Sequence, residues 1–154
     1  MSYKKSVDTL RVLIGTHQTL VGSARLNDII GELNRIPTSA RFPRRSGWLL
    51  AVLHTTRALD TTLSEVVKNK GWWNSRQQSL GAYLMTLKNN AVLTQTERNH
   101  YQHNVVSMRN TYMHQAGAIP SKIDADVLLA EMHACVANVL RNVLSRTPKL
   151  RLIL

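Results

Sequence analysis

The chain has 154 residues, which is enough for one domain with its own hydrophobic core. Lysine and arginine total 20 against 9 acidic residues, a formal net charge of +11. This charge favours a polyanionic partner, with nucleic acid first and an acidic membrane surface second, and an acidic protein partner is the alternative. The single Cys135 excludes an intrachain disulfide, and neither a signal peptide nor a bilayer-spanning apolar run is recognised, so we expect a cytoplasmic protein with no membrane partner.

Apolar residues recur at helical spacing along most of the chain. The first helix is expected to bend near Gly22-Ser23, and a basic loop containing Pro37 and Pro43 follows it. Thr94 and Glu97 form a capping box at the start of the fourth helix. The predicted helices span about 7–35, 47–68, 75–91, 94–115 and, from Ser121 or Asp124, about 121–146. Since no run alternates like a strand, the sequence predicts an all-α, up-and-down bundle of about five helices, one domain over 1–154 with residues 147–154 as a tail free to move.

The fourth predicted helix carries different chemistry on its two sides. One side is an apolar stripe expected to face the core, made of Tyr101, Val105, Met108 and Tyr112. The opposite side has imidazole, hydroxyl and amide groups but no carboxylate, from His103, Ser107, Asn110 and His114. Such a row can bind a phosphate or a partner helix. A solvated surface or a hydrogen-bonded helix contact is the plainer interpretation.

Residues 109–114 read Arg-Asn-Thr-Tyr-Met-His, and this run resembles the signature of the HEPN superfamily. Within it, a guanidinium, an amide and an imidazole can bind phosphate and move a proton without a metal. The resemblance implies a small all-α domain acting as a dimeric, metal-independent endoribonuclease, with Arg109, Asn110 and His114 in the shared cleft. Such nucleases serve as toxins or in antiviral defence, while other family members bind partners without catalysis.

The same resemblance sets limits on regulation and geometry. One HEPN subgroup has a tyrosine two residues after the histidine, the target of an antitoxin enzyme, but Ala116 stands here. This departure argues against regulation of that form. An antitoxin of another kind, or a larger defence complex, is the partner expected from the resemblance. Arg109 and His114 lie about 140° apart on an ideal helix, so joint action requires a distorted helix, a curled arginine or two copies of the chain.

A nuclease would also need to bind its RNA at positions away from the reacting phosphate. Basic residues in the first loop and around Trp72-Trp73 are candidate contacts, because cations can bind phosphates while aromatic rings stack on bases. At least one of these two tryptophans is expected to pack in the core. The candidate RNA-binding residues are Arg41, Arg44, Arg45, Lys68, Lys70, Arg76, His103 and Ser107.

Other reactive side chains favour structural roles. His17 and His54 lie among apolar residues and are expected to be buried and hydrogen-bonded, and Cys135 is expected in the core. His100 and His103 could begin a zinc site, but no neighbouring Cys, Asp or Glu completes it, so we expect no metal and no other cofactor. A DNA-binding helical protein is a further alternative, although no compact helix-turn-helix pattern is evident.

Overall fold

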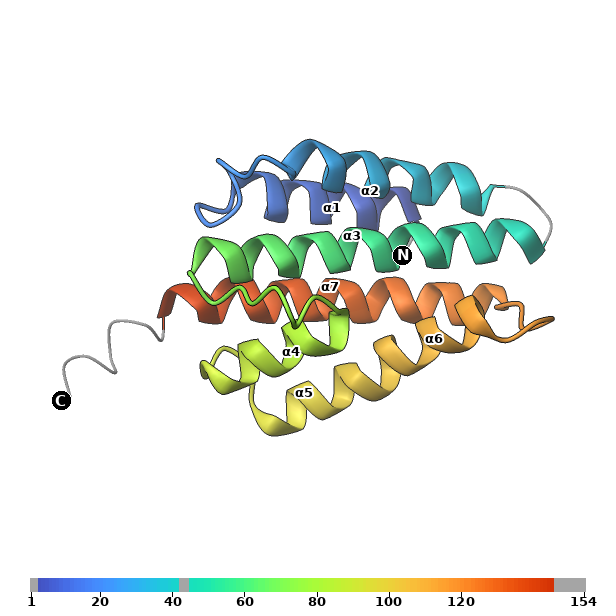
Figure 1. The fold of residues 1–154 in the computed structure, drawn as a ribbon. Helices are drawn as coiled ribbons and strands as arrows, with labels where there is room; N and C mark the ends of the chain where they lie inside the picture. Colours follow the sequence, from blue (N-terminus) through green and yellow to red (C-terminus); the bar gives the residue numbers. More distant parts are fainter. Residues whose placement is uncertain (1–2, 42–44, 146–154) are drawn as a thin grey trace, which may run out of the picture.

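A computed structural model describes residues 3–41 and 45–145, and in these ranges the chain is all-α (Figure 1). Gln95–Tyr101, the π-helical turn Gln102–Val106 and Ser107–His114 follow one another without a break. The described part therefore has six helical rods, one more than the sequence predicted. The elements are α1 (Tyr3–Thr16), α2 (Leu26–Ala40), α3 (Arg45–Asn69), α4 (Leu80–Asn89), α5 (Gln95–Tyr101), η1 (Gln102–Val106), α6 (Ser107–His114) and α7 (Lys122–Ser145).

The predicted first helix over 7–35 is wrong, because the chain reverses between α1 and α2. His17 stabilises the reversal: its Nδ1 accepts a hydrogen bond from the Thr19 amide, and its Nε2 donates to the Leu140 carbonyl of α7 at 2.9 Å. The expected structural role of His17 is thus confirmed. What the sequence analysis treated as a bend is a full turn, which lays α2 beside α1.

Two other predicted boundaries need correction. The first half of the expected loop from 36 to 45 is helical, since α2 continues through Pro37 to Ala40, and residues 42–44 lie outside the described ranges. Ile36 and Ser39 are buried there, and this packing holds the last turn despite the hydrogen bond that proline removes. The third predicted helix begins at Leu80, not Ser75, with Ser79 accepting from the Ala82 amide as the N-cap. The capping box of Thr94 and Glu97 is confirmed.

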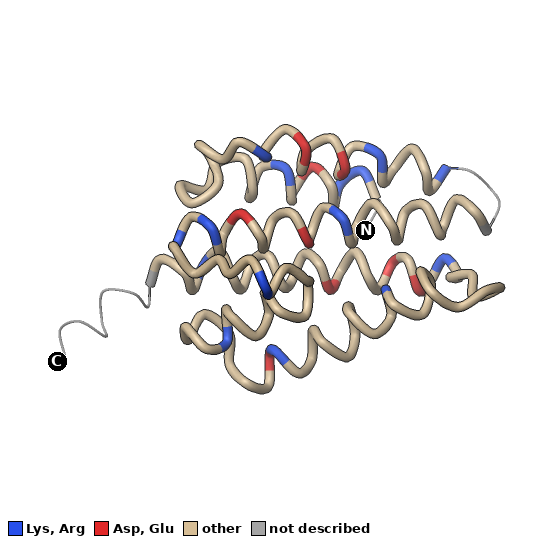
Figure 2. Tube along the Cα trace, in the orientation of Figure 1, with Lys and Arg blue, Asp and Glu red and all other residues tan. Residues whose placement is uncertain are grey.

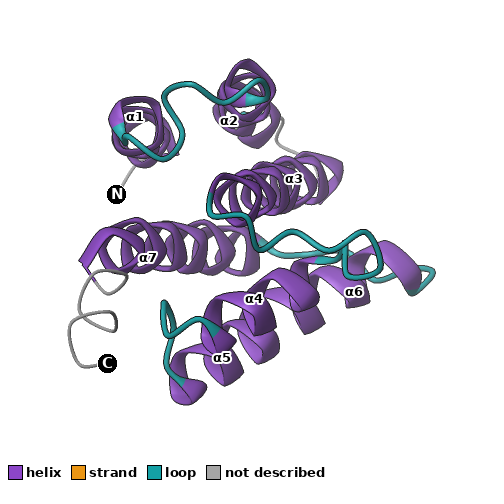
Figure 3. Ribbon diagram, turned by 60° about the vertical axis from the view of Figure 1, so that its left-hand side comes forward, coloured by secondary structure: helices purple, strands orange, loops and turns teal. Residues whose placement is uncertain are grey.

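The helices form three layers (Figure 3). α1 and α2 make one outer layer, α3 and α7 the middle layer, and α4 with the α5–η1–α6 rod the other outer layer. The core lies between these layers and consists mainly of leucine, valine and isoleucine. Cys135 is buried in it, as expected, and burial raises the pKa of its thiol.

The stretch Lys122–Leu144 of α7 is long and apolar enough, by length and composition, to cross a membrane. The sequence analysis missed it. In this fold the helix runs through the middle layer, where Leu128, Met132, Val136 and Val139 are fully buried. An apolar composition of this kind is what a central bundle helix requires.

The π-helical turn η1 rotates everything that follows it. A π turn contains one more residue than an α turn, which displaces the later side chains by about 100° around the axis. Of the predicted apolar stripe, Tyr101 before the π turn and Val105 within it are buried, whereas Met108 and Tyr112 after it are only half-buried against the core. No residue of α6 is fully buried. The helix that carries the motif therefore lies at the surface.

Candidate functional site

The polar row predicted for the fourth helix is exposed along η1 and α6. His103, Asn110 and His114 are all exposed, and His114 ends the helix. Ser107 is exposed too, but both its amide and its hydroxyl donate to the Gln102 carbonyl, the hydroxyl at 3.1 Å. Ser107 thus closes the π turn, while the two imidazoles and the Asn110 amide face solvent.

Arg109 is half-buried and lies close to α3. Burial raises the pKa of Asp60 on α3, and the positive charges of Arg109 and then Arg25 only partly offset this. One carboxyl oxygen of Asp60 is buried without a hydrogen-bond partner. The guanidinium of the motif therefore lies within electrostatic range of an acidic residue of its own chain.

Arg109 and His114 both lie in α6, which is regular α-helix, so the expected separation of about 140° persists. The distortion at η1 precedes both residues and does not bring them together. Within one chain, the exposed His114 and the half-buried Arg109 lie on different sides of the helix. A site that uses both on one atom needs a second copy of the chain or a large movement of the arginine.

The end of α6 is attached to the start of α7. Tyr112 donates its hydroxyl to Asp124 at 2.8 Å, and Asp124 also accepts from the Ser121 amide at 3.0 Å while its own amide donates to the Ser121 hydroxyl. The Ser121 amide, followed by the Tyr112 hydroxyl, lowers the pKa of Asp124. The reciprocal bonds of Ser121 and Asp124 cap the start of α7, and the Tyr112 hydroxyl ties the last turn of α6, which ends at His114, to this cap.

The segment that carries the motif is nearly free of formal charge. From Asn99 to Ser121, the only lysine, arginine, aspartate or glutamate is Arg109 (Figure 2). The same segment exposes two large apolar side chains, Met113 and Ile119, each 46% accessible. Depletion of charge combined with exposed apolar groups is typical of the centre of a protein–protein interface.

His100 has an acidic partner that its sequence neighbours did not suggest. Glu131 of α7 reaches its Nε2 at 2.7 Å, and Asn104 contacts the same ring. His103 is exposed one helical turn away. Within residues 3–41 and 45–145, no group of three His, Cys, Asp or Glu side chains is arranged to hold a metal ion.

The predicted RNA-binding residues are separated in space. Arg41 is exposed at the end of α2, and Arg45 begins α3, whereas Arg44 lies outside the described residues. Lys68 is at the other end of α3, roughly 35 Å from Arg45 at the helical rise per residue. Figure 1 shows α6 ending on the same side as the start of α3, so Lys68, Lys70 and Arg76 lie far from the motif.

The tryptophan pair is divided as expected. Trp72 packs against the core, and Trp73 is exposed with Lys68 Nζ 5.5 Å from its ring centroid. This cation–π contact occupies one face of the ring. Lys70 is half-buried and Arg76 is exposed nearby in the chain. The residues could contact a strand only at this remote end.

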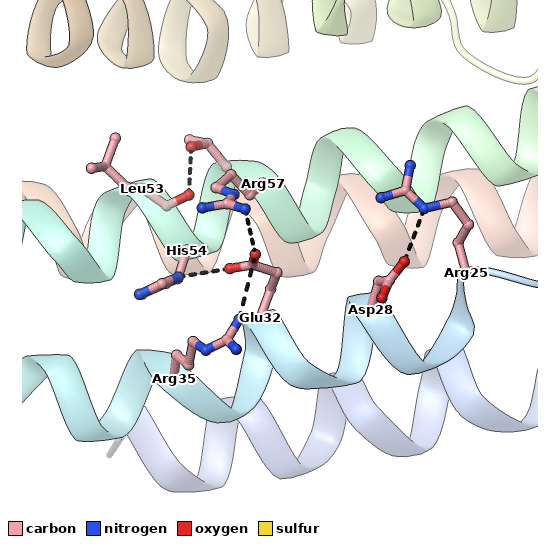
Figure 4. A network of polar contacts seen from close by, with 8 residues as sticks. Arg25, Asp28, Glu32, Arg35, Leu53, His54 and Arg57 are labelled. Carbon is pink, nitrogen blue, oxygen red and sulfur yellow. Dashed lines mark hydrogen bonds and ion pairs between the residues drawn. The ribbon is translucent and has the colours of Figure 1, made fainter.

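A polar network that was not predicted from the sequence joins α2 to α3 (Figure 4). The buried carboxylate of Glu32 accepts from His54 Nδ1 at 2.6 Å and contacts Arg57 at 3.1 Å and Arg35 at 3.7 Å. His54 is therefore hydrogen-bonded, as expected. The i, i+3 spacing of Glu32 with Arg35, and of His54 with Arg57, was visible in the sequence. Its significance required knowing that α2 packs on α3.

Comparisons with known proteins gave no matching family model, no matching curated protein and no matching solved structure. The resemblance of residues 109–114 to the HEPN signature thus depends on the motif and its place in the chain.

Proposed function

We propose that this protein is a metal-independent endoribonuclease that acts as a homodimer through the α5–η1–α6 rod. The observation that carries the proposal is the character of residues 99–121: a surface segment whose only formal charge is Arg109 and which presents His103, Asn110 and His114 to solvent. Two such segments can meet with little charge repulsion. The imidazoles would then line a shared groove with no carboxylate of this segment to repel RNA.

RNA supplies its own nucleophile, the 2′-hydroxyl beside the scissile phosphate. His114 of one copy would take the proton from this hydroxyl as the 2′-oxygen bonds to phosphorus. As the bond from phosphorus to the 5′-oxygen breaks, His114 of the other copy would donate a proton to the leaving oxygen. The products are a 2′,3′-cyclic phosphate and a 5′-hydroxyl, so the reaction is balanced without water or metal.

Arg109 would bind the non-bridging oxygens and stabilise the additional negative charge of the transition state. Asn110 would orient the phosphate or the imidazole. Because Arg109 and His114 point to different sides of α6, the arginine of one copy would serve the histidine of the other. The nearby Asp60 carboxyl group, when charged, would oppose the approach of a phosphate to Arg109.

The second candidate function is a helical module that binds nucleic acid or a protein without catalysis. The electrostatic influence of Asp60 on Arg109 favours this candidate, because an arginine near a carboxyl group of its own chain is less available to a transition state. Both candidates share the charge-poor surface. They differ in whether His114 transfers a proton.

As a biological role, we propose a toxin or antiviral effector acting on RNA in the cytoplasm, with an antitoxin or a larger defence complex as its restraint. This extension depends on the HEPN resemblance of residues 109–114. The high positive charge is consistent with an RNA substrate.

The test is incubation of the purified protein with total RNA in EDTA, followed by analysis of the new ends. We expect cyclic phosphate and 5′-hydroxyl ends. His114→Ala should lower the cleavage rate by about 10²–10⁴-fold, the usual contribution of general acid–base catalysis, and should leave RNA affinity unchanged.

Gln115→Ala is the matched control, because Gln115 is the exposed next residue in the chain. It should cleave like the wild type. Cleavage that stops in EDTA would refute the mechanism. RNA binding without cleavage in the wild-type protein would establish the non-catalytic module instead.

A further inference from the structure

Glu32 is a buried carboxylate with more cationic partners than its charge requires. Its side chain is 10% exposed and meets one imidazole and two guanidinium groups. The side chains of Arg35 and Arg57 remain 62% and 68% exposed. A guanidinium has five N–H donors in a fixed plane, so each arginine contacts Glu32 along one edge and keeps other donors directed to solvent.

These arginines line an open cleft of about 350 Å³ between α2 and α3, together with Arg25, Asp28 and Gly31. Asp28 is already paired with Arg25 at 3.1 Å. The cleft therefore contains three guanidinium groups against two carboxylates that are both engaged. Its lining is polar and contains no aromatic residue, which suits a phosphate and offers nothing on which a base can stack.

Gly31 is the second indication of a ligand. It lies inside α2, where glycine weakens a helix, and a Cβ built at this position meets no atom within 4 Å. Packing within the chain therefore does not require a glycine. A side chain here would occupy the cleft, so the glycine keeps the space beside the guanidinium groups open.

The cleft also leads toward the motif. Asp60 lies three residues after Arg57 on α3, hence on nearly the same face, and its carboxylate is influenced by both Arg25 of the cleft and Arg109 of α6. α3 packs against both α2 and α6, so it connects the cleft with the predicted catalytic helix. No residue of this cleft was among the RNA contacts predicted from the sequence.

We propose that the cleft formed by Arg25, Arg35, Arg57 and Gly31 binds a backbone phosphate of RNA and directs the strand to Arg109. The contact is independent of base sequence, because the cleft recognises phosphate alone. The inference that the bound strand continues to the motif rests on the proposed nuclease function, but phosphate binding in the cleft does not.

The test compares Gly31→Glu with Gly31→Gln, two variants of nearly the same size that differ in charge. The probe is a labelled, mixed-sequence 2′-O-methyl RNA, which cannot undergo 2′-hydroxyl attack, and fluorescence anisotropy in EDTA measures its affinity. The introduced carboxylate would pair with the arginines and exclude a phosphate, so we expect binding about tenfold weaker for Gly31→Glu than for Gly31→Gln. Equal affinities of the two variants would overturn the proposal.

A second measurement does not depend on filling the cleft. For Arg35→Ala/Arg57→Ala, the salt dependence of log Kd should become shallower by about 1.4, the value for two lost phosphate contacts on a single strand. Lys4→Ala/Lys88→Ala removes the same charge from α1 and α4 and should change this slope much less. Equal losses in both double variants would show that only net charge matters and would overturn the site.

Cleavage of ordinary RNA separates this site from the nuclease proposal. If Gly31→Glu weakens binding while the wild type never cleaves, the phosphate site stands and the nuclease is wrong. If the wild type cleaves in EDTA and Gly31→Glu binds and cleaves equally well, the nuclease stands and the phosphate site is wrong.

Discussion

Asp60 is the least well satisfied acidic side chain near the motif. One of its oxygens is buried without a partner, and burial raises its pKa despite Arg109 and Arg25. We expect Asp60→Asn to stabilise the fold at pH 7 by about 1 kcal/mol, the lower end of the cost of a buried unsatisfied group, because the residue as a whole is only partly buried. For a protein of this size, the melting temperature should rise by about 2–4 °C.

The pH dependence of this gain has a definite sign. A raised pKa means that folded Asp60 holds its proton more tightly than in the unfolded chain, so the wild type recovers stability as the pH falls to that pKa. The advantage of Asp60→Asn should therefore disappear in acid. Asp124→Asn is the control of opposite sign, since hydrogen bonds lower the pKa of Asp124 and its charge stabilises the fold at neutral pH. Thermal unfolding of both variants from pH 3 to 7 measures this, and a constant gain across the range would contradict it.

At the scale of elements, η1 decides which side of α6 faces α3. Deleting one residue from a π turn restores α-helical hydrogen bonding and leaves the later helix in register, whereas deletion from a regular helix rotates all that follows by about 100°. Deletion of the exposed His103 should therefore cost less than about 1 kcal/mol. Deletion of Asn110 in α6 should cost several times more, because Tyr112 would lose Asp124. Urea unfolding distinguishes the two, and equal losses would show that η1 does not absorb the deletion.

Local signals predicted the helices where those signals are strong. The Thr94–Glu97 capping box and the start of α7 near Ser121 were predicted, because side chains satisfying a helix start leave a short-range pattern. The reversal after α1 was not predicted, because it depends on the contact of His17 with Leu140, which is 123 residues away in the chain. Joining α1 and α2 into one helix also concealed the pairing of α2 with α3 and hence the surroundings of Glu32.

For the candidate site, the sequence predicted that Asn110 and His114 share one side of a helix, and both are exposed. The π turn was not foreseen, because Gln102–Val106 has ordinary helical composition. The proximity of Arg109 to Asp60 was missed for the same reason. Periodicity gives the order of side chains around one helix, but tertiary packing gives the direction in which that helix is turned.

For the whole molecule, tyrosine ionisation limits stability in alkali. Burial raises the pKa of Tyr101 and of Tyr112 to about 12, and it raises the pKa of Tyr3 as well. Groups with raised pKa stabilise the fold below their unfolded value near 10, and this contribution is lost as the pH rises toward 12. We expect loss of helicity between about pH 10 and 12 together with a steep rise in tyrosinate absorbance. Circular dichroism and absorbance at alkaline pH check this, and gradual titration near pH 10 with intact helices would contradict it.

Two molecules that each carry +11 repel one another over most of their surfaces. Residues 99–121 contribute little to that repulsion, since Arg109 is their only formal charge. Dissolved ions screen the repulsion and so favour self-association, yet the same ions weaken the hold of arginines on a polyanion. Higher ionic strength therefore favours assembly of the dimer and weakens binding of RNA. A bound RNA strand is itself a polyanion, so it neutralises the positive charge of two copies and favours their association without added salt.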